Sequence, residues 1–223
     1  MKKILALLCA VAFVFSMAAT ASAIPITNGG FETGDFTGWS VYVPPGASAE
    51  VVTSYTTSDP GGVVTYDPME GSYFAKLKTD GHASYTTLRQ TINLTSNSSV
   101  HGWAAFEDND FGGMYNDLAA VTIYDTIGTL LAVPWYQSSN LVNGVGVYGQ
   151  TPWQYWTWTP PDSGDYVVEL AIANVGSQIN DSFALFDGVR ASPEPATLLL
   201  VGSGFLGFAG IGRKRFIKRQ HNT

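Results

Sequence analysis

Between about residue 49 and residue 190, apolar and polar side chains alternate along the chain in short runs. Thr, Val, Tyr, Gly, Ser and Asn dominate these runs, and no stretch repeats its apolar residues at helical spacing. Alternation with a period of two, rich in β-branched and aromatic residues, is typical of β-strands. The pattern predicts nine strands, at 49–54, 72–78, 84–94, 100–106, 119–125, 130–135, 154–159, 165–174 and 182–190.

Turn residues separate the predicted strands. Asp80-Gly81, Ile127-Gly128 and the run 160–164 (Pro-Pro-Asp-Ser-Gly) are examples, in which Gly and Pro supply the backbone angles that turns need. So many short strands favour an all-β fold, a single jelly-roll β-sandwich. We expect the last turn to join 154–159 and 165–174 as a hairpin. In it, Glu169 and Ala171 share one face of their strand, because side chains alternate.

The first 23 residues have a different pattern. Lys2 and Lys3 precede an apolar stretch over residues 4–15, and Ala21-Ser22-Ala23 follows as a small-x-small cleavage motif. This order is typical of a secretory signal peptide, so the mature chain is expected to begin at Ile24. A membrane-spanning anchor is the alternative, and it is disfavoured because the run is short and a cleavage motif follows it.

The C-terminal end has three parts in a fixed order. Pro193, Glu194 and Pro195 come first, a run of 17 uncharged residues follows at 196–212, and a basic cluster opens with Arg213, Lys214 and Arg215. As a transmembrane helix the run is about 25 Å long, at the lower limit for a bilayer. The basic cluster then stays in the cytoplasm. A buried core helix is the alternative, but it leaves the basic flank unexplained.

These three parts together resemble the PEP-CTERM sorting signal. The resemblance implies recognition by an exosortase, a membrane cysteine transpeptidase, at or near Pro193-Glu194-Pro195, with the inner membrane as a transient anchor. It also implies a Gram-negative host that makes extracellular polysaccharide or biofilm, and a mature protein at the cell surface or beyond it. The expected organisation is a signal peptide at 1–23, a jelly-roll domain at 24–191 and a sorting tail at 192–223.

Charge is strongly segregated along the 223 residues. The whole chain has a formal charge of −7, but residues 24–191 hold four basic and seventeen acidic residues, a formal charge of −13. Such an acidic surface repels phosphate backbones, so nucleic acid is not an expected partner. It suits a domain that holds cations or meets neutral partners. The only cysteine, Cys9, lies within the signal segment, so the mature chain is expected to have none.

The predicted domain carries a second resemblance. Residues 27–39 (Thr-Asn-Gly-Gly-Phe-Glu-Thr-Gly-Asp-Phe-Thr-Gly-Trp) are followed in order by 70–73 (Glu-Gly-Ser-Tyr), 163–166 (Ser-Gly-Asp-Tyr) and the last strand, 182–189. In this order they resemble galactose-binding-like jelly-roll domains, the fold of many carbohydrate-binding modules. The resemblance spans nearly the whole domain. It departs in the last strand, where such modules often have Asp-Asp-Val but Phe186 and Gly188 flank Asp187.

The second resemblance implies one structural Ca²⁺. In the resembling modules an ion joins the opening motif to the last strand. By position, Glu32 and Asp187 would supply carboxylates, Gly30 a backbone carbonyl, and Glu70 is a candidate fourth ligand. Calcium takes six to eight oxygen ligands, so this residue set suits it. The alternative is that Glu32 caps a turn and that Asp187 is a solvated strand end.

Aromatic residues are the candidates for a sugar-binding surface. We expect Trp39, Trp156 and Trp158 to lie in the core, because large aromatics fill sandwich interiors. Exposure is expected instead near the Gly/Asn/Ser-rich stretch 138–149, because such stretches form surface loops. The candidate ligand-binding residues there are Trp135, Tyr136, Tyr148 and Trp153.

No motif in the sequence predicts catalysis. The histidines are scattered, and there is no Gly-x-Ser-x-Gly elbow, His-Glu-x-x-His helix or phosphate-binding loop. The expected function is non-enzymatic: an exported protein that binds carbohydrate of the exopolysaccharide or biofilm. A structural matrix protein without a defined small ligand is the alternative, and a hydrolase acting on the matrix is a weaker one.

Overall fold

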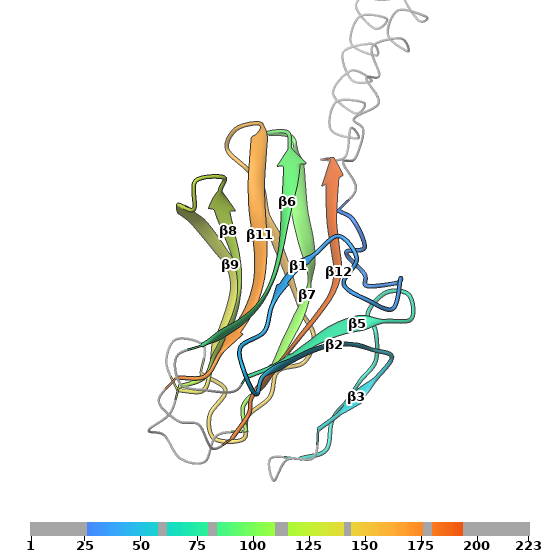
Figure 1. The fold of residues 1–223 in the computed structure, drawn as a ribbon, viewed down its shortest axis with the longest axis vertical. Coiled ribbons are helices and arrows are strands. Elements are labelled where there is room, and N and C mark those ends of the chain that lie inside the picture. Colours follow the sequence, from blue (N-terminus) through green and yellow to red (C-terminus); the bar gives the residue numbers. More distant parts are fainter. Residues whose placement is uncertain are drawn as a thin grey trace, which may run out of the picture.

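The computed structural model describes residues 26–57, 62–79, 84–109, 116–140, 144–175 and 180–193 (Figure 1). The predicted signal peptide, Glu194, Pro195 and the basic residues Arg213, Lys214 and Arg215 lie outside this part of the chain. The predicted start of the mature chain, Ile24, lies outside it as well. Within the described ranges, no helix has the length and apolar character needed to cross a bilayer.

The chain forms two antiparallel five-stranded sheets that pack as a sandwich (Figure 1), which confirms the predicted all-β fold. The strands of the first sheet, in order, are β1 (Ser40–Tyr42), β6 (Tyr85–Leu94), β11 (Gly164–Ala173), β8 (Leu118–Asp125) and β9 (Leu130–Ser138). The strands of the second sheet are β10 (Gln154–Trp158), β7 (Ser98–Glu107), β12 (Phe183–Pro193), β5 (Phe74–Lys78) and β2 (Ser48–Val52). A separate two-stranded ribbon joins β3 (Tyr55–Thr56) to β4 (Thr65–Tyr66).

The core lies between the two sheets. Alternate residues of β6, β8 and β11 face it from the first sheet, and Leu88, Ile123 and Leu170 are fully buried there. Phe106 and Phe186 close it from the second sheet. The other face of the first sheet is left for polar and aromatic side chains, because successive side chains of a strand point to opposite faces.

All nine predicted strands exist, but two of them do not pair as predicted. The expected hairpin is wrong: β10 pairs with β7 in the second sheet, whereas β11 pairs with β6 and β8 in the first. The turn at 159–163 therefore carries the chain from one sheet to the other. Trp158 and Tyr166, on either side of this turn, pack edge to face with ring centroids 5.1 Å apart.

The N-terminal segment, residues 26–39, lies beside β12 (Figure 1). The Val189 amide donates to the Gly29 carbonyl over 2.9 Å, and a Cβ on Gly29 would come within 1.8 Å of the Val189 oxygen. Only glycine allows this approach. Phe31 is fully buried and stacks on Trp39 at 5.7 Å, so the segment is anchored in the core on one side and along β12 on the other.

Candidate functional site

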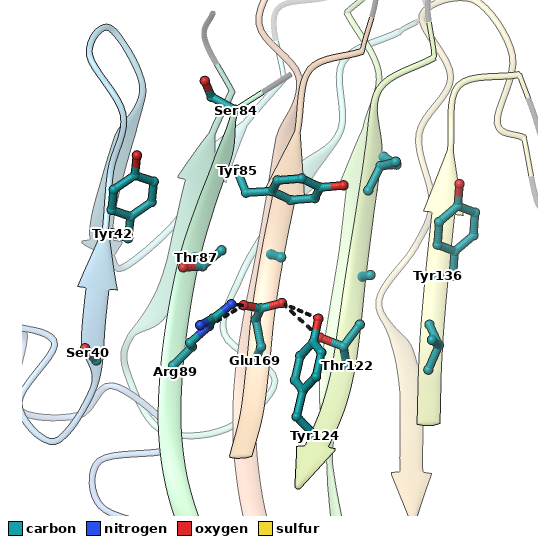
Figure 2. A pocket seen from close by; sticks show the side chains of 14 residues that line it. Ser40, Tyr42, Ser84, Tyr85, Thr87, Arg89, Thr122, Tyr124, Tyr136 and Glu169 are labelled. Atoms are coloured by element: carbon teal, nitrogen blue, oxygen red, sulfur yellow. Dashed lines mark hydrogen bonds and ion pairs between the residues drawn. The ribbon is translucent and has the colours of Figure 1, made fainter. Parts of the chain in front are cut away.

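The outward face of the first sheet is hollowed into an open groove of about 910 Å³. All five strands of the sheet contribute side chains to it (Figure 2). The lining residues are Ser40, Tyr42, Ser84, Tyr85, Thr87, Arg89, Leu118, Ala120, Thr122, Tyr124, Val133, Tyr136, Glu169 and Ala171. Ligand pockets in proteins commonly have volumes of about 300–1,000 Å³, so the groove has room for a chain of several small units.

The distribution of side-chain size explains the hollow. The central strands present small side chains to it, such as Ala171 on β11 and Ala120 on β8. The edge strands present large rings, Tyr42 on β1 and Tyr136 on β9, which stand on opposite sides of the groove in Figure 2. Tyr42 is 61% exposed and Tyr85 is 48% exposed. The rings therefore form walls that a ligand can reach from solvent.

A hydrogen-bonded cluster occupies the floor (Figure 2). The Arg89 side chain donates to Oε2 of Glu169 through Nε and forms an ion pair with the same oxygen through Nη2. The Thr122 hydroxyl donates to Oε1 of Glu169 over 3.1 Å, and the Tyr124 hydroxyl over 3.2 Å. Glu169 is 5% exposed, whereas the Arg89 side chain is 55% exposed. Glu169 thus holds Arg89 in place, and Arg89 keeps further N–H donors for a ligand.

The groove combines apolar rings with a few oriented polar groups. Glu169 is the only acidic residue among its lining residues. Because Glu169 is paired with Arg89, the groove offers apolar rings and oriented polar groups with little net charge on its floor.

The four predicted ligand-binding aromatics do not come together. Tyr136 lines the groove. Trp135 is 5% exposed and packs edge to face on Phe186, so the prediction that it is exposed is wrong. Its neighbour in β9 takes the outward position instead, because successive side chains of a strand alternate.

The other two candidates also lie away from the groove. Trp153 packs against Phe74 at 5.5 Å, and its indole N–H donates to the Asp67 carbonyl. Tyr148 lies in the loop before β10 with a positive φ of 52°. Trp39, Trp156 and Trp158 pack in the main core as predicted.

Tyr42, Tyr85, Arg89 and Glu169 are groove residues that sequence reasoning did not select. One signal pointed to Glu169, since it is the one acidic residue within the otherwise apolar run 166–173 of its strand. The other three carry no comparable signal, because outward-facing Tyr and Arg are ordinary on the exposed face of a sheet.

The predicted metal ligands lie where the N-terminal segment meets β12. Both carboxylate oxygens of Glu32 accept from the Ser72 amide at 3.0 Å. Oδ2 of Asp187 accepts from the Met69 and Glu70 amides at 2.7 and 2.9 Å. The two carboxylates therefore hold the same turn, residues 69–73, from two sides.

Gly30 lies between these two carboxylates. A Cβ placed on it would lie 3.9 Å from Oδ1 of Asp187 and 4.0 Å from Oε1 of Glu32. Glu70 forms an ion pair with Arg190. Within the described residues, no three His, Cys, Asp or Glu side chains are grouped so that one ion could contact all of them.

Burial raises the pKa of the Asp187 carboxyl to about 6, although the backbone amides of Glu70, Gly188 and Met69 favour its charged form. The negative charge of Glu70 raises it further. A carboxyl group so deprived of water is one whose charged form a nearby cation would stabilise.

Comparison with known proteins identifies one family signature. Residues 193–215 match the PEP-CTERM protein-sorting motif. This motif implies export and processing by an exosortase at the membrane of a Gram-negative bacterium. No curated protein matches the chain.

Solved structures with a similar fold include the carbohydrate-binding module TmCBM61, determined in complex with β-1,4-galactotriose. It shares 16% identity over 78% of this chain and 100% of its own, with a TM-score of 0.49. The CBM22-1 xylan-binding domain of Xyn10C from Paenibacillus barcinonensis has 13% sequence identity to this chain. The match covers 78% of this chain and 97% of that domain, with a TM-score of 0.37. The K3 adhesin domain of Lys-gingipain from Porphyromonas gingivalis also has 13% sequence identity. That match covers 75% of this chain and 99% of the adhesin domain, with a TM-score of 0.42.

Proposed function

We propose that this protein is an exported envelope or matrix protein whose sandwich binds a neutral carbohydrate chain in the groove of the first sheet. The observation that carries the proposal is the groove itself, with tyrosine walls on β1 and β9 and a clamped arginine on its floor. The sorting motif at 193–215 supports the proposed location in the envelope or matrix. The polysaccharide of the cell's own matrix is the ligand that this location favours.

The chemistry of the groove matches that of a sugar. A pyranose ring has an apolar C–H face, which packs on aromatic rings, and a rim of hydroxyls, which need donors and acceptors. Tyr42 and Tyr136 supply the rings, and Arg89 supplies donors. Because Glu169 pairs with Arg89, the floor carries little net charge, which suits a neutral ligand better than an acidic one.

The predicted calcium ion belongs to this proposal as a structural element. Carboxylate oxygens of Glu32 and Asp187 both lie close to Gly30, between the N-terminal segment and β12, and the raised pKa of Asp187 fits a cation there. Glu70 fits less well, because its ion pair with Arg190 already engages it. The ion would supply a link between two segments that are far apart in the sequence, and it would take no part in sugar binding.

The test is affinity electrophoresis of the purified protein through gels that contain candidate matrix polysaccharides. The double substitution Tyr42→Ala and Tyr136→Ala should weaken binding, because it removes both walls. Loss of an aromatic contact of this kind costs about 1–2 kcal/mol each, or roughly 5–30-fold in Kd.

Tyr155→Ala is the matched control, because Tyr155 is a comparably exposed tyrosine (52%) on β10 of the second sheet. It should leave binding unchanged. Equal retardation of the double variant and the wild type would refute binding in the groove. Absence of retardation by any polysaccharide would favour the structural matrix protein instead.

A further inference from the structure

The polar end of the sandwich interior has the composition of a second cation site, remote from the Glu32–Asp187 region. We define the polar layer as Asp108, Asp117, Ser139, Asn174 and Ser182. Each of these residues is at most 1% exposed. They come from five separate segments of the chain, and they lie beyond the strand ends that carry the apolar core.

On the first sheet, two side chains of the layer stand side by side. Ala173 pairs with Leu118 at the end of the β11–β8 ladder, so Asn174 lies opposite Asp117 one residue further on. Leu118 and Ala171 face the groove. Alternation therefore points Asn174 and Asp117 to the interior. The Val175 amide donates to Oδ1 of Asp117 over 3.0 Å.

On the second sheet, Asp108 and Ser182 form the facing pair. Ala184 pairs with Phe106, and both side chains lie in the core. Ser182 is two residues from Ala184, and Asp108 is two residues from Phe106. Both therefore lie on the same face as the core residues. The Ser182 hydroxyl lies 3.4 Å from Oδ1 of Asp108.

Ser139 connects the two sheets. Its hydroxyl donates to Oδ1 of Asp108 over 2.6 Å, and its amide donates to the Asp117 carbonyl over 2.9 Å. Two aspartates from opposite sheets thus belong to one network within the interior. Carboxylates at such depth are held by hydrogen bonds, by ion pairs or by metal ions.

An independent observation points to a ligand. Oδ1 of Asn174 is fully buried and accepts no hydrogen bond from the described part of the chain, while its Nδ2 donates to the Asn180 carbonyl. A buried amide oxygen without a donor is costly. A cation is the partner that would relieve it, since an amide oxygen beside the carboxylate of Asp117 is a ligand that hard cations prefer.

We propose that the polar layer binds a calcium ion through the carboxylates of Asp108 and Asp117 and the amide oxygen of Asn174. The hydroxyls of Ser139 and Ser182 and the carbonyl of Asp117 add oxygens nearby. The set contains oxygen donors alone, which favours calcium over metals that prefer nitrogen or sulfur. The ion ties the two sheets together beneath the end of the groove where Tyr85 and Leu118 lie.

The test measures calcium per chain by elemental analysis of the purified full-length protein after desalting, together with thermal unfolding in calcium and in chelator. Asp117→Asn keeps the shape of the side chain and the oxygen that accepts from Val175, but it removes a charge. It should lower the bound calcium by one ion per chain and weaken calcium affinity roughly 100-fold. An unchanged calcium content in this variant overturns the proposal.

Asn174→Asp gives a prediction of opposite sign and does not depend on how well Asp117→Asn folds. A third carboxylate should destabilise the protein in chelator but bind calcium about tenfold more tightly. If the melting temperature of the variant falls by the same amount in calcium as in chelator, relative to the wild type, the layer is only hydrogen-bonded and the proposal is wrong. Asn97→Asp, at an exposed turn at the other end of the sandwich, is the control and should change neither quantity.

A separate variant distinguishes this ion from the one proposed at the N-terminal segment. Glu32→Gln should reduce the calcium bound there and leave the Asp117-dependent ion in place. Loss of the Asp117-dependent ion in this variant would show that the two regions are not independent, and it would overturn the assignment of a second site.

Discussion

Glu169 is the side chain that sets the floor of the groove. Four donor atoms from Arg89, Thr122 and Tyr124 surround its carboxylate. A carboxyl group engaged in this way is poorly placed to deliver or accept a proton during hydrolysis. Its effect is to orient Arg89.

The same network gives a stability prediction. Glu169→Ala should lower the free energy of unfolding by about 1–3 kcal/mol, because two hydroxyls and a guanidinium lose their shared acceptor on the floor of the groove. Glu169→Gln keeps one acceptor oxygen, so its free energy of unfolding should fall by less. Urea unfolding of the three proteins measures this. Glu50→Ala is the control, because Glu50 pairs with Lys76 at a half-exposed position, and exposed pairs contribute about 0–1 kcal/mol. An equal loss in all variants would contradict the prediction.

Individual side chains also mark the limit of what the sequence could predict about the groove. Trp135 and Tyr136 are neighbours in β9 with opposite orientations, and the β8–β9 ladder contains two register shifts between Val121 and Tyr124. Each shift changes which face a residue takes. Composition could identify an aromatic segment there, but not which of its rings faces outward.

At the scale of elements, the local pattern was sufficient to locate strands but not to pair them. All nine predicted strands form because alternation and turns are local signals. The strands missed, β1, β3 and β4, have three, two and two residues, too few to show a period. Pairing depends on which sheet each turn leads to. The turn before β11 crosses between sheets, because β10 pairs with β7 whereas β11 pairs with β6 and β8, and all three partners are distant in the sequence.

The junction between the N-terminal segment and β12 is the element whose stability should depend on calcium. If calcium binds Glu32 and Asp187 as proposed, it would stabilise the folded chain by about 2.7 kcal/mol at a hundred times Kd. For a domain of this size, this corresponds to a melting temperature higher by roughly 5–10 °C. Asp187→Ala and Glu32→Ala should each remove most of this gain, as measured by thermal unfolding in calcium and in chelator. Asp165 is an exposed acidic residue on a strand, and the control variant Asp165→Ala should keep the full stabilisation by calcium. Equal melting temperatures of the wild type in both conditions would refute a calcium ion here.

At the scale of the whole molecule, the sorting motif begins where the sandwich ends. The match starts at residue 193, and Pro193 is the last residue of β12, paired with Ser98 of β7. No spacer separates the folded domain from the segment that an exosortase recognises. A processing enzyme must therefore bind the motif directly beside the paired end of β12.

A flexible Gly-Ser spacer between Ser192 and Pro193 should speed the release of the protein from the membrane, because the motif then becomes accessible without unpairing of β12. Pulse-chase fractionation of membrane and released protein measures the rate. The same spacer inserted after Gly128, at the exposed β8–β9 turn, should have no effect. A rate that the first insertion leaves unchanged would mean that the end of β12 does not limit processing.

The central position of β12 has a mechanical consequence. It lies between β7 and β5 in the second sheet, and the chain continues from its C-terminal end toward the sorting tail. If the tail were held while a ligand pulled on the groove, force would enter the domain through β12. It would first load the β12–β7 ladder in shear, because that ladder extends to Pro193 whereas β5 pairs with β12 only at 183–186. A strand loaded in shear in this way would resist extraction from its sheet better than an edge strand whose hydrogen bonds open one after another.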